Sequence, residues 1–263
     1  MSANTINQYF GLKPDVPDHR DHYFSVFRAV STLPTFVDLR SSCPTPFNQF
    51  SLGSCTANAV AGSLKFAQTK QRKSVQFTSS RLFIYYNTRT LEGTINEDSG
   101  ASLRNTIKAV GKWGGPPETD WTYDISKFRI KPPQVAYTNG ANNQAISYMR
   151  VTQSPTMIQT SLADGFPFVF GFAVYQSFDT SATAATGIVP MPSMNEANLG
   201  GHAVQAVGYN ATNVPINGVP ARHYICRNSW GPYWGANGYF FMPFDYLHND
   251  DLAADFWTIR LVE

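Results

Sequence analysis

Cys55 lies in the stretch FNQFSLGSCTANAV, six positions after Gln49 and among small residues. A free thiol has a pKa of about 8.5 and is mostly protonated at neutral pH, so it needs help to act as a nucleophile. Ala57, Val60 and Leu64 recur at three- and four-residue spacing after it, which predicts a helix with one buried face. The N-terminus of that helix would favour a thiolate at Cys55.

Thiol chemistry also needs a group that takes the proton and a second group that orients the first. Among the five histidines, His202 stands apart because it follows two glycines at the start of the apolar run HAVQAVGY. Asn228 comes later, in the segment RNSWG, with Trp230 two residues further on. An indole in this position can cover a polar contact and keep water away. The pattern therefore indicates a cysteine, a histidine and an asparagine that act together.

These segments together resemble the papain-like cysteine peptidases, in particular the bacterial members with a short propeptide, from about Thr35 to the C-terminus. The resemblance implies an α+β protein with the papain-like fold. In that fold a helical left lobe faces a β-sheet or barrel right lobe, and the active site lies in the cleft between them.

The resemblance also assigns a role in peptide hydrolysis to each of these residues. Cys55 is the nucleophile that attacks the scissile carbonyl and forms a thioester, and His202 deprotonates the thiol and later protonates the leaving amine. Asn228 holds the imidazole in plane, and Gln49 joins the Cys55 backbone N–H in stabilising the oxyanion. No cofactor and no metal ion is implied.

The substrate groove is assigned by the same resemblance. Gly53 matches the small residue that lets a substrate backbone pass close, and Gly100, in DSGASL, matches the glycine that pairs with an extended substrate. Trp230 matches the ring that shields the polar pair, and Gly201 and Ala203 are assigned to the second substrate pocket.

Three positions depart from the family pattern. Leu52 stands where the family often has a disulfide-forming cysteine, Thr56 replaces an aromatic residue, and Gly201 replaces the aspartate that precedes the histidine in papain. The three cysteines of the chain are too few, and odd in number, for a disulfide framework. Because the sequence also starts without a secretory signal, we expect a reducing, cytoplasmic location.

The elements that must position these residues change character along the chain. Residues about 50–134 show helical periodicity, with further helices expected at RLFIYYNTR and over 102–113. Residues about 135–245 are typical of strands, at FVFGFAV, HAVQAVGY, HYICR and GYFFM, with one helix capped by Ser154. We expect these two halves to form one catalytic domain over 34–263.

The segment 1–33 precedes this domain and poses a separate question. Two prolines prevent one long helix, while Tyr9, Phe10 and Leu12 offer apolar anchors. One hypothesis is that the segment lies extended across the active-site groove or along the sheet, as the short intramolecular inhibitor of a zymogen. The alternative is a permanent structural strap.

Composition narrows the classes of partner. Only 14% of the residues are charged, the net charge is +2 and KQRK at 70–73 is the longest basic run, so we expect no nucleic-acid partner. No apolar stretch reaches the roughly 18 residues of a membrane helix, so we expect no membrane partner. HRDH at 19–22 is interpreted as a solvated polar turn and not as a metal site. The expected partners are polypeptide substrates and the chain's own N-terminal segment, on a monomer.

The sequence as a whole predicts a cysteine endopeptidase that acts through Cys55, His202 and Asn228. Three alternatives stay open. An exopeptidase would result if a loop or strap filled one end of the cleft, and a closed peptide-binding relative would keep the residues without the activity. A cysteine-dependent acyltransferase uses a similar cysteine and histidine but typically an aspartate as the third member, which the asparagine in NSWG disfavours.

Overall fold

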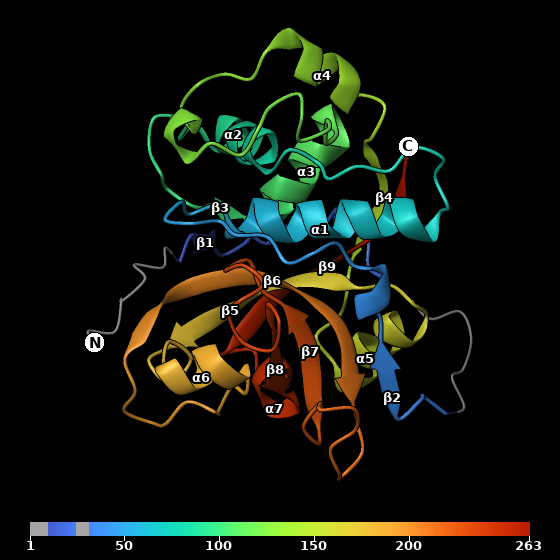
Figure 1. The fold of residues 1–263 in the computed structure, drawn as a ribbon, viewed down its shortest axis with the longest axis vertical. Helices are drawn as coiled ribbons and strands as arrows, with labels where there is room; N and C mark the ends of the chain where they lie inside the picture. Colours follow the sequence, from blue (N-terminus) through green and yellow to red (C-terminus); the bar gives the residue numbers. More distant parts are fainter. Residues whose placement is uncertain (1–9, 25–31) are drawn as a thin grey trace.

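The structure is a computed structural model, and it describes residues 10–24 and 32–263. Tyr9, one of the expected anchors, lies outside the described residues. Within them the predicted α+β class is confirmed: Figure 1 shows α1 to α4 on one side of the molecule and a large sheet with α5 to α7 on the other. The helices are α1 (Cys55–Lys70), α2 (Arg81–Glu92), α3 (Leu103–Trp113), α4 (Gln134–Gly140), α5 (Pro155–Ala163), α6 (Ser181–Thr186) and α7 (Phe244–His248), with 3-10 turns at Arg40–Ser42 and Ile125–Lys127.

The large sheet has seven strands, which pair in the order β4-β9-β5-β6-β7-β8, with β2 also paired to β6, and every pairing in it is antiparallel. A second, two-stranded sheet joins β1 and β3 in parallel. The strands are β1 (Leu12–Lys13), β2 (Phe36–Asp38), β3 (Ala101–Ser102), β4 (Ala145–Arg150), β5 (Phe168–Tyr175), β6 (Asn198–Asn210), β7 (His223–Arg227), β8 (Tyr239–Pro243) and β9 (Ala253–Val262).

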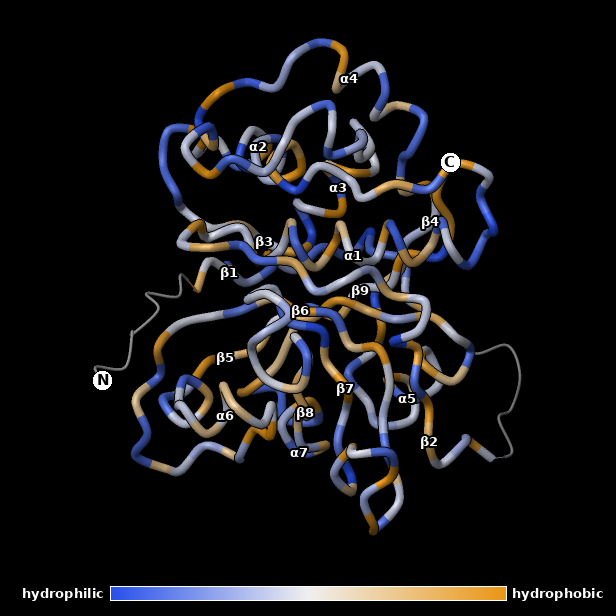
Figure 2. Tube along the Cα trace, viewed as in Figure 1, coloured by the Kyte–Doolittle hydropathy of each residue, from blue (hydrophilic) through white to orange (hydrophobic). Residues whose placement is uncertain are grey.

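The central strand β5 divides the core in two, because successive side chains of a strand point to opposite faces. Phe168, Phe170 and Phe172 belong to an aromatic core inside the sheet, where the Phe170 ring stacks on Phe256 at 5.5 Å between ring centroids. Val169, between them, belongs to the second core, beneath the helices. Figure 2 shows the hydrophobic stretches along these strands, with hydrophilic positions on the outer loops.

The helix α1 belongs to the second core and is buried on nearly all sides. The sequence predicted that only one face of this helix is buried, and this prediction was wrong because nearly all faces are buried. Its small residues, such as Ala57, Ala61 and Gly62, let the sheet and the other helices approach the backbone from several directions. The Gly62 position, for example, admits the guanidinium of Arg227 from β7.

The other predicted helices and strands are confirmed. The Ser154 side chain caps α5 by accepting a hydrogen bond from the Met157 N–H, as its position before Pro155 indicates. The sequence missed β4 and β9, the latter beyond the strand-rich range expected to end near residue 245. Burial along both strands is irregular and lacks a period of two, which is why no pattern marked them.

The start of the described chain crosses the molecule between the helices and the sheet. Leu12 and Lys13 pair with Ala101 and Ser102, and further along the chain Arg150 of β4 exchanges backbone hydrogen bonds with His22 and Phe24. Extended backbone thus follows first the helical side and then the sheet side (Figure 1). None of the helices of the described residues is long and apolar enough to cross a bilayer.

Candidate active site

Cys55 is the first residue of α1 and is fully buried. Burial raises the pKa of its thiol to about 11, and backbone N–H groups around the sulfur, those of Ala203, Gly11, Thr56 and Cys55 itself, oppose the rise. The helix N-terminus was expected to favour the thiolate, but in this closed arrangement the loss of solvent outweighs it. The sulfur therefore sits among amide donors in its neutral form.

His202 lies within β6, and the Nε2 atom of its ring is 2.9 Å from Oδ1 of Asn228. The same oxygen accepts the Ser229 backbone N–H at 2.8 Å, which identifies it as the acceptor end of the amide. His202 must then carry its proton on Nε2, so Nδ1 is the basic nitrogen. Nδ1 is buried and has no hydrogen-bond partner in the described part of the chain.

Aromatic rings enclose this imidazole. Trp230 stacks on it at 5.0 Å between centroids, and Phe172 and Phe10 meet it edge-on at 5.7 Å and 6.2 Å. Burial lowers the pKa of His202 to about 4, while the hydrogen bond that its Nε2 donates to Asn228 opposes the shift. The ring is therefore neutral at physiological pH, which suits a base.

Gln49 is fully buried at the turn that precedes α1. Its Oε1 accepts the Ser229 hydroxyl at 2.6 Å and its Nε2 donates to the Leu52 carbonyl at 3.0 Å, while its backbone N–H bonds the Ser229 carbonyl. Residues 228–230 thus hold both Gln49 and His202. Gln49 and His202, which lie far apart in the sequence, are therefore positioned by the same short segment.

Gly53 and Gly100 lie on either side of Gly11, from the N-terminal segment. A Cβ on Gly11 would overlap the Gly53 carbonyl, and a Cβ on Gly100, which has φ +68°, would overlap the Gly11 carbonyl. The Gly11 carbonyl accepts the Ala101 N–H at 2.8 Å. We call Phe10–Lys13 the groove segment, because its extended backbone runs between these two glycines and over the Cys55 sulfur.

The neighbouring side chains of the groove segment cover the rest of the site. Phe10 lies over His202 and Trp230, and Leu12 lies against Gly171 and Gly201. A cavity of about 350 Å³ opens beside Leu12 and is also lined by Leu252. Of the two residues assigned to the second pocket, Gly201 lines this cavity, whereas Ala203 lies in the core beside Cys55.

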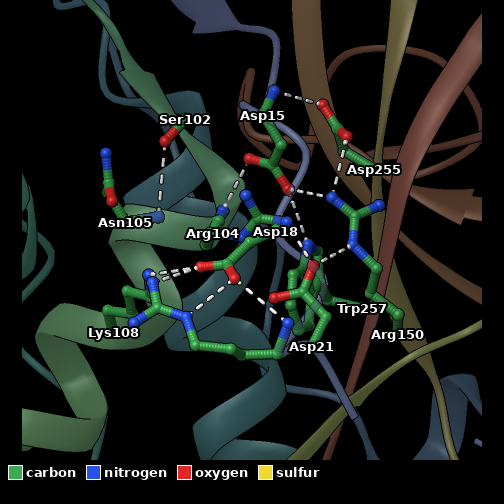
Figure 3. Close-up of polar contacts among 11 residues, drawn as sticks. Asp15, Asp18, Asp21, Ser102, Arg104, Asn105, Lys108, Arg150, Asp255 and Trp257 are labelled. Carbon is green, nitrogen blue, oxygen red and sulfur yellow. Dashed lines mark hydrogen bonds and ion pairs between the residues drawn. The ribbon is translucent and has the colours of Figure 1, made fainter. Parts of the chain in front are cut away.

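A group of buried charges beyond the groove segment holds the N-terminal chain in place, as Figure 3 shows. We call Asp15, Asp21, Arg104, Arg150 and Asp255 the ionic cluster. Arg150 contacts Asp15 at 2.9 Å, Asp21 at 2.8 Å and Asp255 at 3.4 Å, and Arg104 pairs with Asp21. Two residues of the N-terminal chain are thereby tied to α3, β4 and β9.

Asp15 is the most enclosed member, with a fully buried carboxylate. It accepts the Arg104 backbone N–H and the Trp257 indole N–H, each at 2.8 Å. Burial raises the pKa of Asp15 and the nearby Asp255 carboxylate adds to the rise, whereas these hydrogen bonds and Arg150 oppose it. Because the partners come from three elements, α3, β4 and β9, no local pattern in the sequence pointed to this cluster.

The sequence predicts that the motif HRDH is a solvated turn, and only part of it is exposed to solvent. Asp18 and Arg20 form an exposed ion pair at 2.8 Å within the turn, but the Asp21 carboxylate is buried in the ionic cluster. Among the described residues no group of histidine, cysteine and acidic side chains is arranged to hold a metal ion. All three cysteines are unpaired.

Comparison with known proteins agrees on one family. A family model described as papain family cysteine protease matches residues 33–251. A peptidase C1-like protein of Acanthamoeba polyphaga mimivirus is 41% identical over all of this chain and 90% of its own length. Cysteine proteinase 3 of Entamoeba histolytica is 27% identical over 91% of this chain and 71% of its own length.

Solved structures give the same result. Xylellain, a cysteine protease from Xylella fastidiosa, superposes with a TM-score of 0.88 and 37% identity, covering 100% of both chains. A digestive procathepsin L2 from Tenebrio molitor, at 19% identity, shares the fold with a TM-score of 0.74 over 98% of this chain and 80% of its own.

The thiol geometry makes a pH prediction for the full chain. Because burial raises the pKa of Cys55 to about 11 and only the thiolate is alkylated, its reaction with iodoacetamide should accelerate steadily between about pH 6 and 10. Peptide mapping assigns the label, since burial raises the pKa of Cys43 to about 12 and that of Cys226 as well. A rate that reaches a plateau below about pH 8 would contradict a neutral, buried thiol.

Proposed function

Because this chain belongs to the papain family of cysteine proteases and is a cysteine peptidase, we propose that it is an endopeptidase that acts through Cys55, His202 and Asn228. The observation that carries the proposal is the orientation of the His202 imidazole. Asn228 fixes Nε2 and leaves Nδ1 as the base. The next residue in the chain, Ala203, directs its backbone N–H to the Cys55 sulfur. That geometry supports nucleophilic catalysis by a thiol.

In the proposed reaction Nδ1 of His202 takes the thiol proton, and the Cys55 sulfur attacks the scissile carbonyl carbon. Charge on the carbonyl oxygen is stabilised by the Cys55 N–H and by the Gln49 amide, whose Oε1 is anchored by Ser229 so that Nε2 is its donating end. The imidazolium then gives its proton to the leaving amine as the C–N bond breaks. Water, deprotonated by the same imidazole, hydrolyses the thioester and restores the thiol.

We further propose that the N-terminal chain is a tethered inhibitor. The groove segment occupies the space between Gly53 and Gly100 and brings the Gly11 N–H to the Cys55 sulfur. An amide in that orientation fills the site without offering a bond to cleave. The ionic cluster then supplies the affinity that keeps the groove segment in place, because releasing it would leave buried charges without partners.

Opening of the groove is predicted for Gly11→Val in the full chain. The new side chain would overlap Gly53, so the groove segment should leave and peptidase activity on a fluorogenic peptide should rise about tenfold or more. Val16→Ala, at a position whose side chain is 77% exposed, serves as the matched control and should not change the rate. An unchanged rate in Gly11→Val, with the fold intact, would argue for a strap.

Loss of the catalytic groups is predicted to act differently at each position. In the Gly11→Val chain, Cys55→Ala should leave no turnover, and Asn228→Ala should lower kcat about tenfold or more because His202 loses its orientation. The exposed Asn142→Ala serves as the control. Steady-state kinetics on one peptide substrate check all three, and full activity in Asn228→Ala would refute the proposed role of the asparagine.

The ionic cluster is tested by Asp15→Ala in the full chain. This change removes the Arg150 contact and leaves the Arg104 and Trp257 donors unpaired, so the groove segment should dissociate more often and activity should rise about fivefold. Asp18→Ala, whose carboxylate pairs mainly with Arg20 in the same turn, should leave activity unchanged. A lower melting temperature without any gain in activity would mean that the cluster is only structural.

A further inference from the structure

The loop between α2 and β3 forms one wall of the groove and is held from beneath by α2. Arg89 donates to the carbonyls of Ile95 and Glu97 at 2.8 Å and 3.0 Å, and its guanidinium lies 4.2 Å from the Tyr85 ring centroid. Burial lowers the pKa of Arg89, while Tyr85 and Asp98 oppose the shift. The Arg89 guanidinium therefore anchors the loop to α2 and lies near the Asp98 carboxylate.

Asp98 connects this wall to the opposite one. Its carboxylate accepts the Gly53 backbone N–H at 3.1 Å and 3.0 Å, one distance for each oxygen, and also accepts the Tyr85 hydroxyl. The Tyr85 oxygen in turn accepts the Gly100 backbone N–H at 3.2 Å. A carboxylate and a phenol thus join Gly53 to Gly100 through hydrogen bonds alone.

The space between the two walls leaves little room for any side chain at Gly53 or Gly11. A Cβ on Gly53 would lie 3.0 Å from the Asp98 carboxylate and 3.5 Å from the Cα of Gly11. The Gly11 carbonyl bonds the Ala101 N–H, the residue directly after Gly100. Because all three cysteines are unpaired, no disulfide ties the two loops together. The Asp98 and Tyr85 bridge is therefore a hydrogen-bonded link between the two walls that an extended peptide meets here.

We propose that Asp98 is a positioning residue for peptide binding, which, with Tyr85, fixes Gly53 and Gly100 at the separation that an extended backbone requires. The inference deepens the proposed peptidase function and rests on it for the identity of the occupant. Asp98 does not touch the sulfur, so its loss should weaken the capture of peptides and leave the reactivity of the thiol itself unchanged.

Two reagents that alkylate Cys55 separate these effects in the full chain. Iodoacetamide is small and needs only access to the thiol, whereas a peptidyl epoxysuccinate must also lie between the two walls. Both need the groove segment to move away, so the ratio of their second-order rate constants cancels any change in that opening. Intact-mass spectrometry measures both constants in the unmodified chain, Asp98→Ala, Asp98→Asn and the control Asp245→Ala, an exposed position on α7.

Asp98→Ala should lower the ratio of the epoxysuccinate to the iodoacetamide rate about tenfold, because a charge-assisted hydrogen bond to the wall is lost. Asp98→Asn keeps an oxygen acceptor for the Gly53 N–H and should restore the ratio to within about threefold, and Asp245→Ala should not change it. An unchanged ratio in Asp98→Ala, or an equal fall in both rates, would overturn the proposal.

Hydrogen exchange at the Ala101 amide provides a test without any chemistry at Cys55. This N–H is protected by the Gly11 carbonyl, so it should exchange faster in Asp98→Ala and return toward the original rate in Asp98→Asn. Unchanged protection would overturn the positioning role even in a chain whose thiol proves unreactive. A thiol inert to both reagents would instead count against the proposed peptidase function.

Discussion

The close approach of one peptide backbone to Gly53, Gly100 and the Cys55 sulfur is the constraint on which the rest of this structure depends. Only residues without a side chain permit it, and Gly11 supplies the third glycine. The approach removes solvent from the site, and this burial holds both the thiol and the imidazole of His202 in their neutral forms. A neutral thiol and an occupied groove both support the proposal that the N-terminal chain inhibits the site.

Buried ion pairs and apolar contacts together hold the short N-terminal chain against the rest of the molecule. The groove segment packs two apolar side chains, Phe10 and Leu12, against the site, and the adjoining Asp15 and Asp21 reach into the seam between α3, β4 and β9. Such buried pairs add little net stability when intact, but breaking one partner is costly. This asymmetry suits the proposed inhibitor, which would stay bound until one of these contacts is disrupted.

Local patterns in the sequence predicted the positions of Cys55 at a helix start and of His202 and Asn228, which the structure places in contact with each other. The direction of the thiol pKa shift could not be predicted, since it depends on burial by a segment that lies more than forty positions away. The roles of Asp15 and Asp98 could not be predicted from the sequence for the same reason. Each is an ordinary loop aspartate whose partners lie on other elements, so only the folded chain brings them together.

Labelling by a peptidyl epoxysuccinate, followed by intact mass, tests most directly whether the N-terminal chain covers a competent site. The full chain, a folded chain that lacks residues 1–33 and a Cys55→Ala control are compared under one condition. Our account predicts fast labelling of the shortened chain, slow labelling of the full chain and none of the control. Equal labelling of the full and shortened chains would contradict it, because the segment would then be a strap on an open enzyme.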